Sequence, residues 1–234
     1  MSKNYSFNNF FASGSNLAAK NIVQKHIATS KNTPTILSIR GKAGMGKSHL
    51  LLAIENQLVT EKLDTNFLYI DSVELVSKYM FAEKDSSLIG FRKKLISLDF
   101  LLVDTVKFLE QHRPCQEILL FIISELAKRN SKIVLAHSDI IKDEHGFIEQ
   151  LAKRFVTQEV NLSELNYLDR VALLNSLVNM RRIVTSTEAI KYLAHQTGNP
   201  RILEHLFNRV VNNAKYLGTQ LDLSFIKSVL DYVR

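Results

Sequence analysis

The segment from Gly41 to Ser48 combines residue types that can bind phosphate. It reads Gly-Lys-Ala-Gly-Met-Gly-Lys-Ser, which matches the pattern G-x-x-x-x-G-K-[ST] of phosphate-binding loops. Gly41, Gly44 and Gly46 allow backbone N–H groups to converge on a phosphate without obstruction by Cβ atoms. We expect Lys47 to reach the β- and γ-phosphates and Ser48 to supply an oxygen to magnesium. The predicted cofactors are ATP or ADP with Mg²⁺.

The residues on either side of this loop supply the structural context that the motif requires. Thr35–Ile39 is a β-branched and apolar run that predicts a strand, and His49–Leu58 carries apolar residues at helical spacing. A strand, a tight turn and a helix in this order direct the positive end of the helix dipole at the phosphates. We also include His49, at the start of this helix, among the residues expected to bind the nucleotide.

A candidate magnesium ligand follows a second apolar run. Phe100–Val103 predicts a buried parallel strand that delivers Asp104 at its carboxyl end. We therefore expect Ser48 and Asp104 to hold the metal, Asp104 usually through water. ATPases of this type usually place a second acid after the aspartate, but here Thr105 follows, and a hydroxyl cannot act as a carboxylate base near neutral pH. Asp104 and Thr105 thus occupy the catalytic positions of at most a slow ATPase.

The remaining pattern predicts an α/β fold with two domains. Apolar runs alternate with helical segments up to about residue 161, which indicates a five-stranded parallel sheet flanked by helices. Only helices are expected after that point, so we predict an α/β domain over 1–161 and a small all-helical domain over 162–234. The five expected strands are Thr35–Ile39, Phe67–Ile70, Phe100–Val103, Lys132–Ala136 and Val156–Val160. The four expected C-terminal helices are Tyr167–Met180, Thr187–Thr197, Pro200–Leu217 and Leu223–Val233.

The amino-acid composition limits the class of protein but does not identify a binding partner. The 234 residues include 30 Lys and Arg against 23 Asp and Glu, a formal net charge of +7. This excess fits contact with a polyanion or simply a solvated basic surface. A single cysteine, Cys115, excludes an internal disulfide and fits a reducing compartment. No signal peptide and no apolar run long enough for a membrane are evident, so we expect a cytoplasmic protein with no membrane partner.

Several segments together resemble the ATPase domain of the bacterial replication initiator DnaA family. Gly41–Ile54 resembles its ATP loop, Tyr5–Phe10 the start of its ATPase domain, and Leu101–Leu109 its magnesium strand. Ile148–Phe155 and Gly198–Val210 are similar to its arginine-finger and lid segments. The resemblance runs through the whole chain and implies an AAA+ P-loop fold with a helical lid. It does not extend to the initiator's duplex-binding domain, so we expect no sequence-specific binding of duplex DNA.

The resemblance also implies roles for individual polar residues. Arg154 falls at the arginine finger, which reaches the γ-phosphate in a neighbouring subunit; the alternative is a solvated arginine at a helix end. Arg201 falls at the second sensor, an arginine that touches ATP from the lid; the alternative is a surface arginine. His137 and Ser138 lie near the polar sensor that follows the fourth strand. Ser138-Asp139 match the family there, but Ile140 replaces its arginine.

A long segment between the second and third strands resembles the initiator-specific insertion. Ser72–Asp99 predicts two helices, which in that family help to hold single-stranded DNA. Its basic cluster, Arg92-Lys93-Lys94, either contacts DNA or forms the solvated face of an amphipathic pair. Initiators carry a Lys-x-Arg-Thr-like group after the magnesium strand, where this chain has His112-Arg113-Pro114-Cys115. We therefore expect at most weak contact with single-stranded DNA.

These features favour an ATP- or ADP-binding protein that acts in, or regulates, initiation of bacterial chromosome replication. Its expected partner is DnaA, or copies of itself, in an ATP-dependent assembly. A chain of this length is also similar to Hda, a regulatory inactivator of the initiator, although no convincing clamp-binding motif precedes Thr35. Two other functions stay open: a helicase-loader-type remodelling ATPase, and a self-contained P-loop kinase of small molecules, which would not need Arg154 or Arg201.

Overall fold

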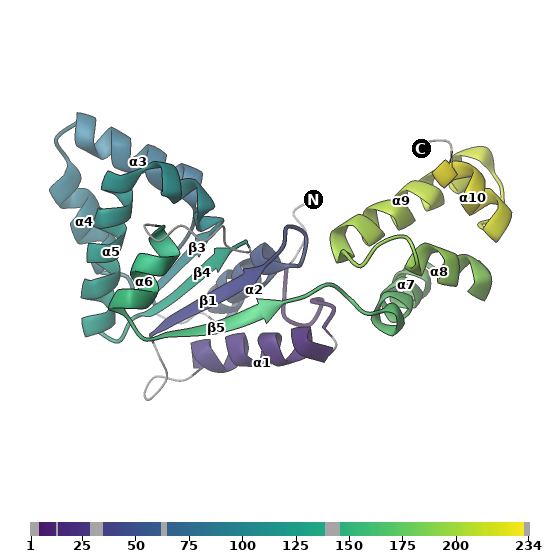
Figure 1. Cartoon of the computed structure of the whole chain (residues 1–234), viewed down its shortest axis with the longest axis horizontal. Helices are drawn as coiled ribbons and strands as arrows, with labels where there is room; N and C mark the ends of the chain where they lie inside the picture. Colours follow the sequence, from purple (N-terminus) through teal and green to yellow (C-terminus); the bar gives the residue numbers. More distant parts are fainter. Residues whose placement is uncertain (1–4, 13, 29–34, 62–64, 139–145, 232–234) are drawn as a thin grey trace. The chain divides into compact units, whose positions relative to one another are not determined.

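The computed structural model describes residues 5–12, 14–28, 35–61, 65–138 and 146–231. A five-stranded parallel sheet forms the core of its α/β part (Figure 1). The strand order is β2-β3-β4-β1-β5, and every neighbouring pair is parallel. The strands are β1 (Ile36–Gly41), β2 (Phe67–Asp71), β3 (Phe100–Asp104), β4 (Lys132–His137) and β5 (Thr157–Leu162). The predicted α/β class and five-stranded parallel sheet are confirmed.

Helices cover this sheet on both faces, which explains why its central strands are apolar runs. One face packs against α3 (Ser72–Lys84), α4 (Leu88–Ile96), α5 (Arg113–Lys128) and α6 (Phe147–Arg154) in a single hydrophobic cluster. Leu101 and Val103 of β3 point into that cluster, so Leu102 and Asp104 point to the opposite face because side chains alternate along a strand. That face is covered by α2 (Lys47–Thr60), which contacts β2, β3 and β4.

Two elements differ from the expectations drawn from the sequence. Helix α1 (Gly14–Ala28) was not predicted; it packs against β5 and α2. Strand β5 begins after Val156, which is 82% exposed, and continues to Leu162. As an edge strand paired with β1 alone, β5 buries Val160 and Leu162 alternately. The two helices predicted for the 72–99 insertion are present as α3 and α4.

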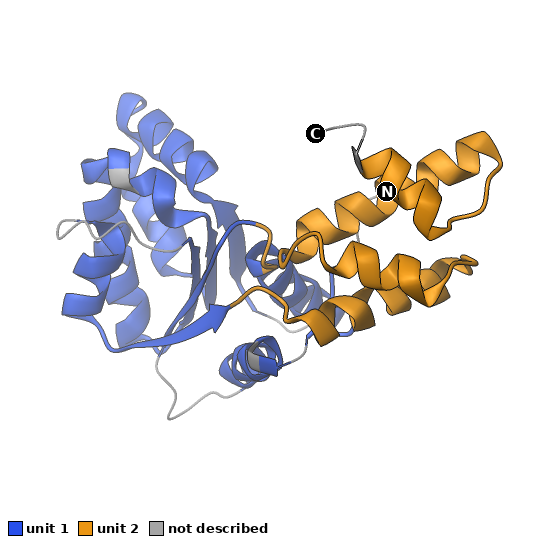
Figure 2. Ribbon diagram, turned by 45° about the vertical axis from the view of Figure 1, so that its right-hand side comes forward, with its two compact units in different colours: residues 1–43, 47–162 blue, residues 44–46, 163–234 orange. Residues whose placement is uncertain are grey.

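The structure divides into two compact units, shown in Figure 2. The first contains residues 1–43 and 47–162, and the second contains residues 44–46 and 163–234. The second unit is helical and has a hydrophobic core of its own, centred on Leu174, Leu203 and Phe207. Its helices are α7 (Tyr167–Arg181), α8 (Thr187–Ala194), α9 (Pro200–Leu217) and α10 (Leu223–Asp231).

Side-chain caps set where these C-terminal helices begin. Asn166 accepts a hydrogen bond from Asp169 N (2.9 Å), and Asn199 accepts from the backbone of the first turn of α9. Such caps satisfy donors that a helix start leaves unpaired. Helix α8 ends at Ala194 rather than at the predicted Thr197. None of the helices in the described residues combines the length and apolar character that crossing a bilayer would require.

Candidate nucleotide-binding site

The predicted phosphate loop lies between the carboxyl end of β1 and the start of α2. Gly44 and Gly46 have φ angles of +85° and +98°, a region that residues with a Cβ rarely adopt. Left-handed conformations of this kind occur in anion-binding nests, where successive backbone N–H groups converge on the ligand. Helix α2 begins at Lys47 and has no acidic residue in its first turn, so its positive dipole end is uncompensated by side chains there.

Lys47 is held against the loop backbone. Its ammonium donates to the carbonyl oxygens of Gly41 (2.6 Å) and Lys42 (3.0 Å). Its charge also contributes to lowering the pKa of His137, at the end of β4, although burial is the main cause of that shift. The structure therefore brings Lys47 near the carboxyl edge of the sheet, where ligands of open α/β folds bind.

Asp104 ends β3 at the same edge and is 5% exposed. Each of its carboxylate oxygens accepts a hydrogen bond from a hydroxyl group. Tyr69 donates to Oδ2 (3.1 Å) and Thr105 donates to Oδ1 (3.3 Å). Burial, reinforced by Asp104, raises the pKa of Tyr69, so this phenol stays protonated and remains a donor.

These residues fit the chemistry of magnesium bound together with a nucleotide. Ser48 and Asp104 offer hard oxygen ligands, which Mg²⁺ prefers alongside phosphate oxygens and water. Across the part of the chain that the structure describes, no group of three or more His, Cys, Asp or Glu side chains could hold a metal ion without further ligands. A magnesium ion here would thus depend on the phosphates for much of its coordination.

Thr105 has an unusual backbone conformation. Its φ and ψ are 54° and 50°, in the left-handed region, where a β-branched residue is a genuine outlier. Ser72 at the start of α3 donates to the Thr105 carbonyl oxygen (2.5 Å), and the short 3₁₀ helix η1 (Val106–Gln111) begins immediately afterwards. Sequence reasoning missed Tyr69 and Ser72, because only the pairing of β2 with β3 brings them to this position.

His137, near the predicted polar sensor, is buried and bonded to β1. Ser38 Oγ lies 2.8 Å from His137 Nε2, and His137 Nδ1 lies 3.0 Å from the Ser138 carbonyl oxygen. A carbonyl can only accept, so Nδ1 carries the proton and Nε2 accepts from Ser38. Ser38 was also missed; a serine inside the apolar run at 35–39 was its only signal. Asp139 and Ile140 lie outside the described residues.

The family model for the bacterial DnaA ATPase domain matches residues 1–162. The chain belongs to this family. It is 31% identical over 230 residues to the chromosomal replication initiator protein DnaA of Helicobacter hepaticus, covering 97% of this chain and 50% of that protein. The chain therefore spans about half the length of this DnaA relative.

Solved structures of DnaA share the fold. Domain III of the Thermotoga maritima replication initiation protein DnaA superimposes with a TM-score of 0.79 at 21% identity, covering 99% of this chain and 97% of that one. A replication initiator DnaA bound to AMPPCP and single-stranded DNA gives a TM-score of 0.79 at 22% identity, covering 92% of this chain and 68% of that one. At these identities, the likeness shows that the fold is shared.

His49 contacts the N-terminal segment in this DnaA-family fold. Its Nε2 lies 3.0 Å from both the Ser6 carbonyl oxygen and Asn9 Oδ1. Its ring also meets the rings of Tyr5 and Phe10 edge-on, with centroids 5.0 and 5.2 Å away. The segment that resembles the start of the DnaA ATPase domain is thus fixed to the first turn of α2. A direct contact between His49 and nucleotide stays a prediction.

The two arginines assigned by resemblance to DnaA are both exposed. Arg154 is the last residue of α6, and its Nη2 donates to Gln150 Oε1 (3.3 Å) one turn earlier. Arg201 lies in the first turn of α9, where its backbone N–H is capped by Asn199 Oδ1 (3.0 Å). Their roles as finger and sensor require a neighbouring subunit or a bound nucleotide, so both stay predictions.

The basic cluster of the DnaA-like insertion lies on α4. Lys93 and Lys94 are exposed, whereas the Arg92 guanidinium lies 6.0 Å from the ring centroid of Phe121 on α5. Arg92 therefore contributes to packing α4 on α5 through a cation–π contact. Two exposed apolar residues lie on the insertion helices: Phe81 on α3 is 66% exposed and Ile89 on α4 is 71% exposed.

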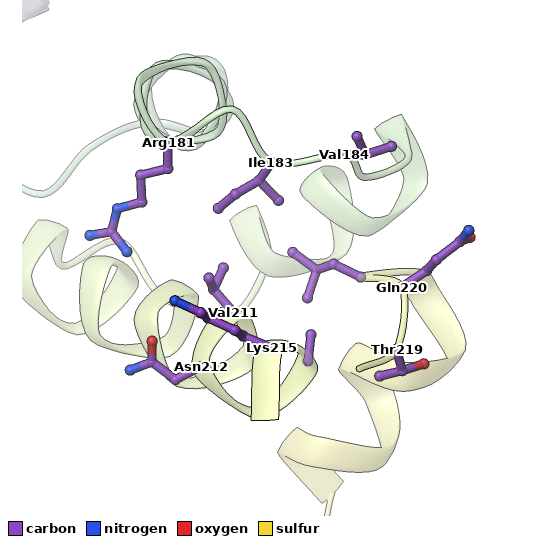
Figure 3. Close-up of a pocket in the computed structure, with 10 residues that line it drawn as sticks. Arg181, Ile183, Val184, Val211, Asn212, Lys215, Thr219 and Gln220 are labelled. Carbon is purple, nitrogen blue, oxygen red and sulfur yellow. The ribbon is translucent and has the colours of Figure 1, made fainter. Parts of the chain in front are cut away.

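A separate, partly open pocket of about 490 Å³ is lined by residues of the helical unit (Figure 3). Arg181 and Lys215 are the charged side chains of its lining, and Ile183, Val211 and Leu221 are among the apolar ones. It shares no residue with the predicted nucleotide site.

Proposed function

We propose that this chain binds ATP or ADP with Mg²⁺ at Gly41–Ser48 and acts as a nucleotide-responsive component of bacterial replication initiation in the cytoplasm. The observation that carries this proposal is the position of Lys47, held over a glycine loop between β1 and α2. Asp104 lies at the same edge of the sheet. Membership of the DnaA ATPase-domain family supports the role in replication.

Each part of the site would act on a different part of the nucleotide. The loop N–H groups and the Lys47 ammonium would bind the phosphate oxygens. Ser48 and Asp104 would hold Mg²⁺, which when bound neutralises charge on the β- and γ-phosphates. Thr105 donates its hydroxyl to Asp104 and supplies no carboxylate to deprotonate water. We infer that the chain binds nucleotide tightly and hydrolyses ATP slowly. This combination suits a switch that stays in its ATP-bound state for a long time.

The switch would act through assembly with other AAA+ subunits. Arg154 is exposed at the end of α6, where it is free of ion pairs within the described residues and can approach a nucleotide held by a neighbour. The neighbour would be DnaA or a second copy of this chain. Weak contact with single-stranded DNA would come from Lys93 and Lys94 on α4, supported by the DNA-bound DnaA that shares this fold.

A pull-down from host extract separates this function from a helicase loader. The tagged chain is incubated with ATP, ADP or no nucleotide, and bound initiator, sliding clamp and replicative helicase are quantified. We expect initiator to be retained most strongly with ATP. Retention of the helicase in place of the initiator would favour a loader. Retention of none of them in any nucleotide state would contradict the proposal.

A further inference from the structure

The side chain of Tyr69 reaches across from β2 to the carboxylate at the end of β3. Asp71 pairs directly with Asp104 in the register of these strands. Tyr69 lies two residues before Asp71, so Tyr69, Asp71 and Asp104 point to the same face of the sheet. Diagonal neighbours in a sheet lie within reach of aromatic side chains. The Tyr69 hydroxyl uses this reach to donate to Asp104 Oδ2 over 3.1 Å.

The other side of the carboxylate is restrained by the turn that follows β3. Thr105 Oγ1 donates to Asp104 Oδ1 (3.3 Å), and the Thr105 carbonyl accepts from Ser72 Oγ on α3. The Thr105 contact comes from the adjacent residue, whereas the Tyr69 contact comes from a separate strand. Among the described residues, Tyr69 is therefore the one that ties the orientation of the carboxylate to a neighbouring strand of the sheet.

We propose that Tyr69 is a positioning residue for magnesium, whose hydroxyl fixes the Asp104 carboxylate in the orientation that holds the Mg²⁺-bound water. This inference rests on the proposed nucleotide site. A carboxylate oxygen can accept more than one hydrogen bond, so the Tyr69 contact leaves acceptor capacity for that water. Without the Tyr69 hydroxyl, the carboxylate keeps the Thr105 contact but loses its restraint from β2. The rotational freedom gained in this way must be lost again when Mg²⁺ binds.

The test is the Mg²⁺ requirement of nucleotide binding in Tyr69→Phe, which keeps the ring and removes the hydroxyl. Affinity for a fluorescent ATP analogue is measured in EDTA and across a series of Mg²⁺ concentrations. We expect Tyr69→Phe to need about 3–10-fold more Mg²⁺ for half of the full gain in affinity, the range for loss of one charge-assisted hydrogen bond that water partly replaces. Affinity in EDTA should stay within about twofold of wild type, since the loop and Lys47 are untouched.

Tyr79→Phe is the matched control. The Tyr79 hydroxyl also donates to a carboxylate, that of Glu83 (3.0 Å), but both residues belong to α3. This variant should keep the wild-type Mg²⁺ requirement. An unchanged requirement in Tyr69→Phe would overturn the inference, and so would an equal loss of affinity in EDTA, which indicates a general structural role. If the wild-type chain binds no nucleotide under either condition, the proposed function itself fails.

Discussion

In the proposed site, nucleotide affinity should depend most directly on Lys47, whose ammonium is held over the loop by the Gly41 and Lys42 carbonyls. We expect Lys47→Ala to lower affinity for ATP and ADP at least about tenfold, or about 1.4 kcal/mol. Equilibrium titration with a fluorescent nucleotide measures this change. Lys42→Ala is the control, because it removes an equal charge from an exposed position in the same loop. Equal affinities of Lys47→Ala and wild type would exclude the predicted site.

In the proposed site, the residue at position 105 should determine how fast a bound nucleotide is hydrolysed. A carboxylate at this position could deprotonate water, and general-base catalysis commonly contributes about 10²–10⁴-fold. We expect Thr105→Asp to raise the single-turnover rate of ATP hydrolysis by at least about tenfold, a threshold set below that range because Asp104 is adjacent. Asp tolerates the left-handed backbone of residue 105 better than a β-branched residue does, so the variant should fold.

Thr105→Asn separates the chemistry from the backbone effect. Asn has the shape of Asp and the same tolerance of the left-handed region, but it cannot accept a proton from water. Its hydrolysis rate should stay near that of wild type. If Asn accelerates hydrolysis as much as Asp, relief of backbone strain and not a general base explains the change.

At the scale of elements, the sequence predicted strands well where both faces are buried. β3 and β4 are continuous apolar runs because helices cover both sides of them. Helix α1 was not predicted because its buried face includes two polar residues. Asn16 is 3% exposed and His26 is 1% exposed. These residues interrupt the apolar spacing that marks a helix.

The supporting residues of the site could not be predicted for a different reason. Tyr69, Ser72 and Ser38 reach Asp104, Thr105 and His137 only through the pairing of strands distant in sequence. A local pattern carries no information on that register. The phosphate loop and Asp104 could be predicted from the sequence because each combines a local motif with an apolar strand.

We expect buried His26 on α1 to make the stability of the fold depend on pH. Burial, assisted by the charge of Lys132, lowers the pKa of His26 from 6.5 to about 4, and within the described residues neither ring nitrogen has a hydrogen-bond partner. Below about pH 6.5, His26 binds a proton in the unfolded chain but stays neutral in the folded chain. The free energy of unfolding therefore falls as the pH drops from about 6.5 toward 4. Between about pH 7.5 and about pH 5 this loss should reach up to about 2 kcal/mol.

Urea unfolding at these two pH values tests the prediction. His26→Leu removes the titrating group, so its stability should fall less than that of wild type across the interval. His205→Leu is the control, because His205 is exposed on α9, and its pH dependence should match wild type. An unchanged pH dependence in His26→Leu would show that other groups cause any loss on acidification.

At the scale of the whole molecule, the predicted arginine finger makes activity a property of assembly. Arg154 is exposed at the end of α6 and bonds only to Gln150 within its own helix among the described residues. A finger supplied by a neighbouring subunit can be worth about 10³-fold or more in related phosphate chemistry. Dilute chain should therefore hydrolyse ATP slowly, and its rate per molecule should rise with protein concentration or with added DnaA.

Arg154→Ala should abolish this rise and leave the slow rate of the dilute chain unchanged, because a residue that acts across an interface contributes nothing to a monomer. The measurement is ATP turnover per molecule over a series of protein concentrations, repeated with DnaA. Lys153→Ala is the matched control: it removes an adjacent exposed charge, one that pairs with Glu149 over 3.4 Å, and it should keep the rise. If Arg154→Ala slows the dilute chain as much as the concentrated one, the arginine acts within its own subunit.

Rapid turnover by the dilute wild-type chain would mean that another residue supplies the base. The chain would then be a self-contained enzyme and not a long-lived nucleotide switch.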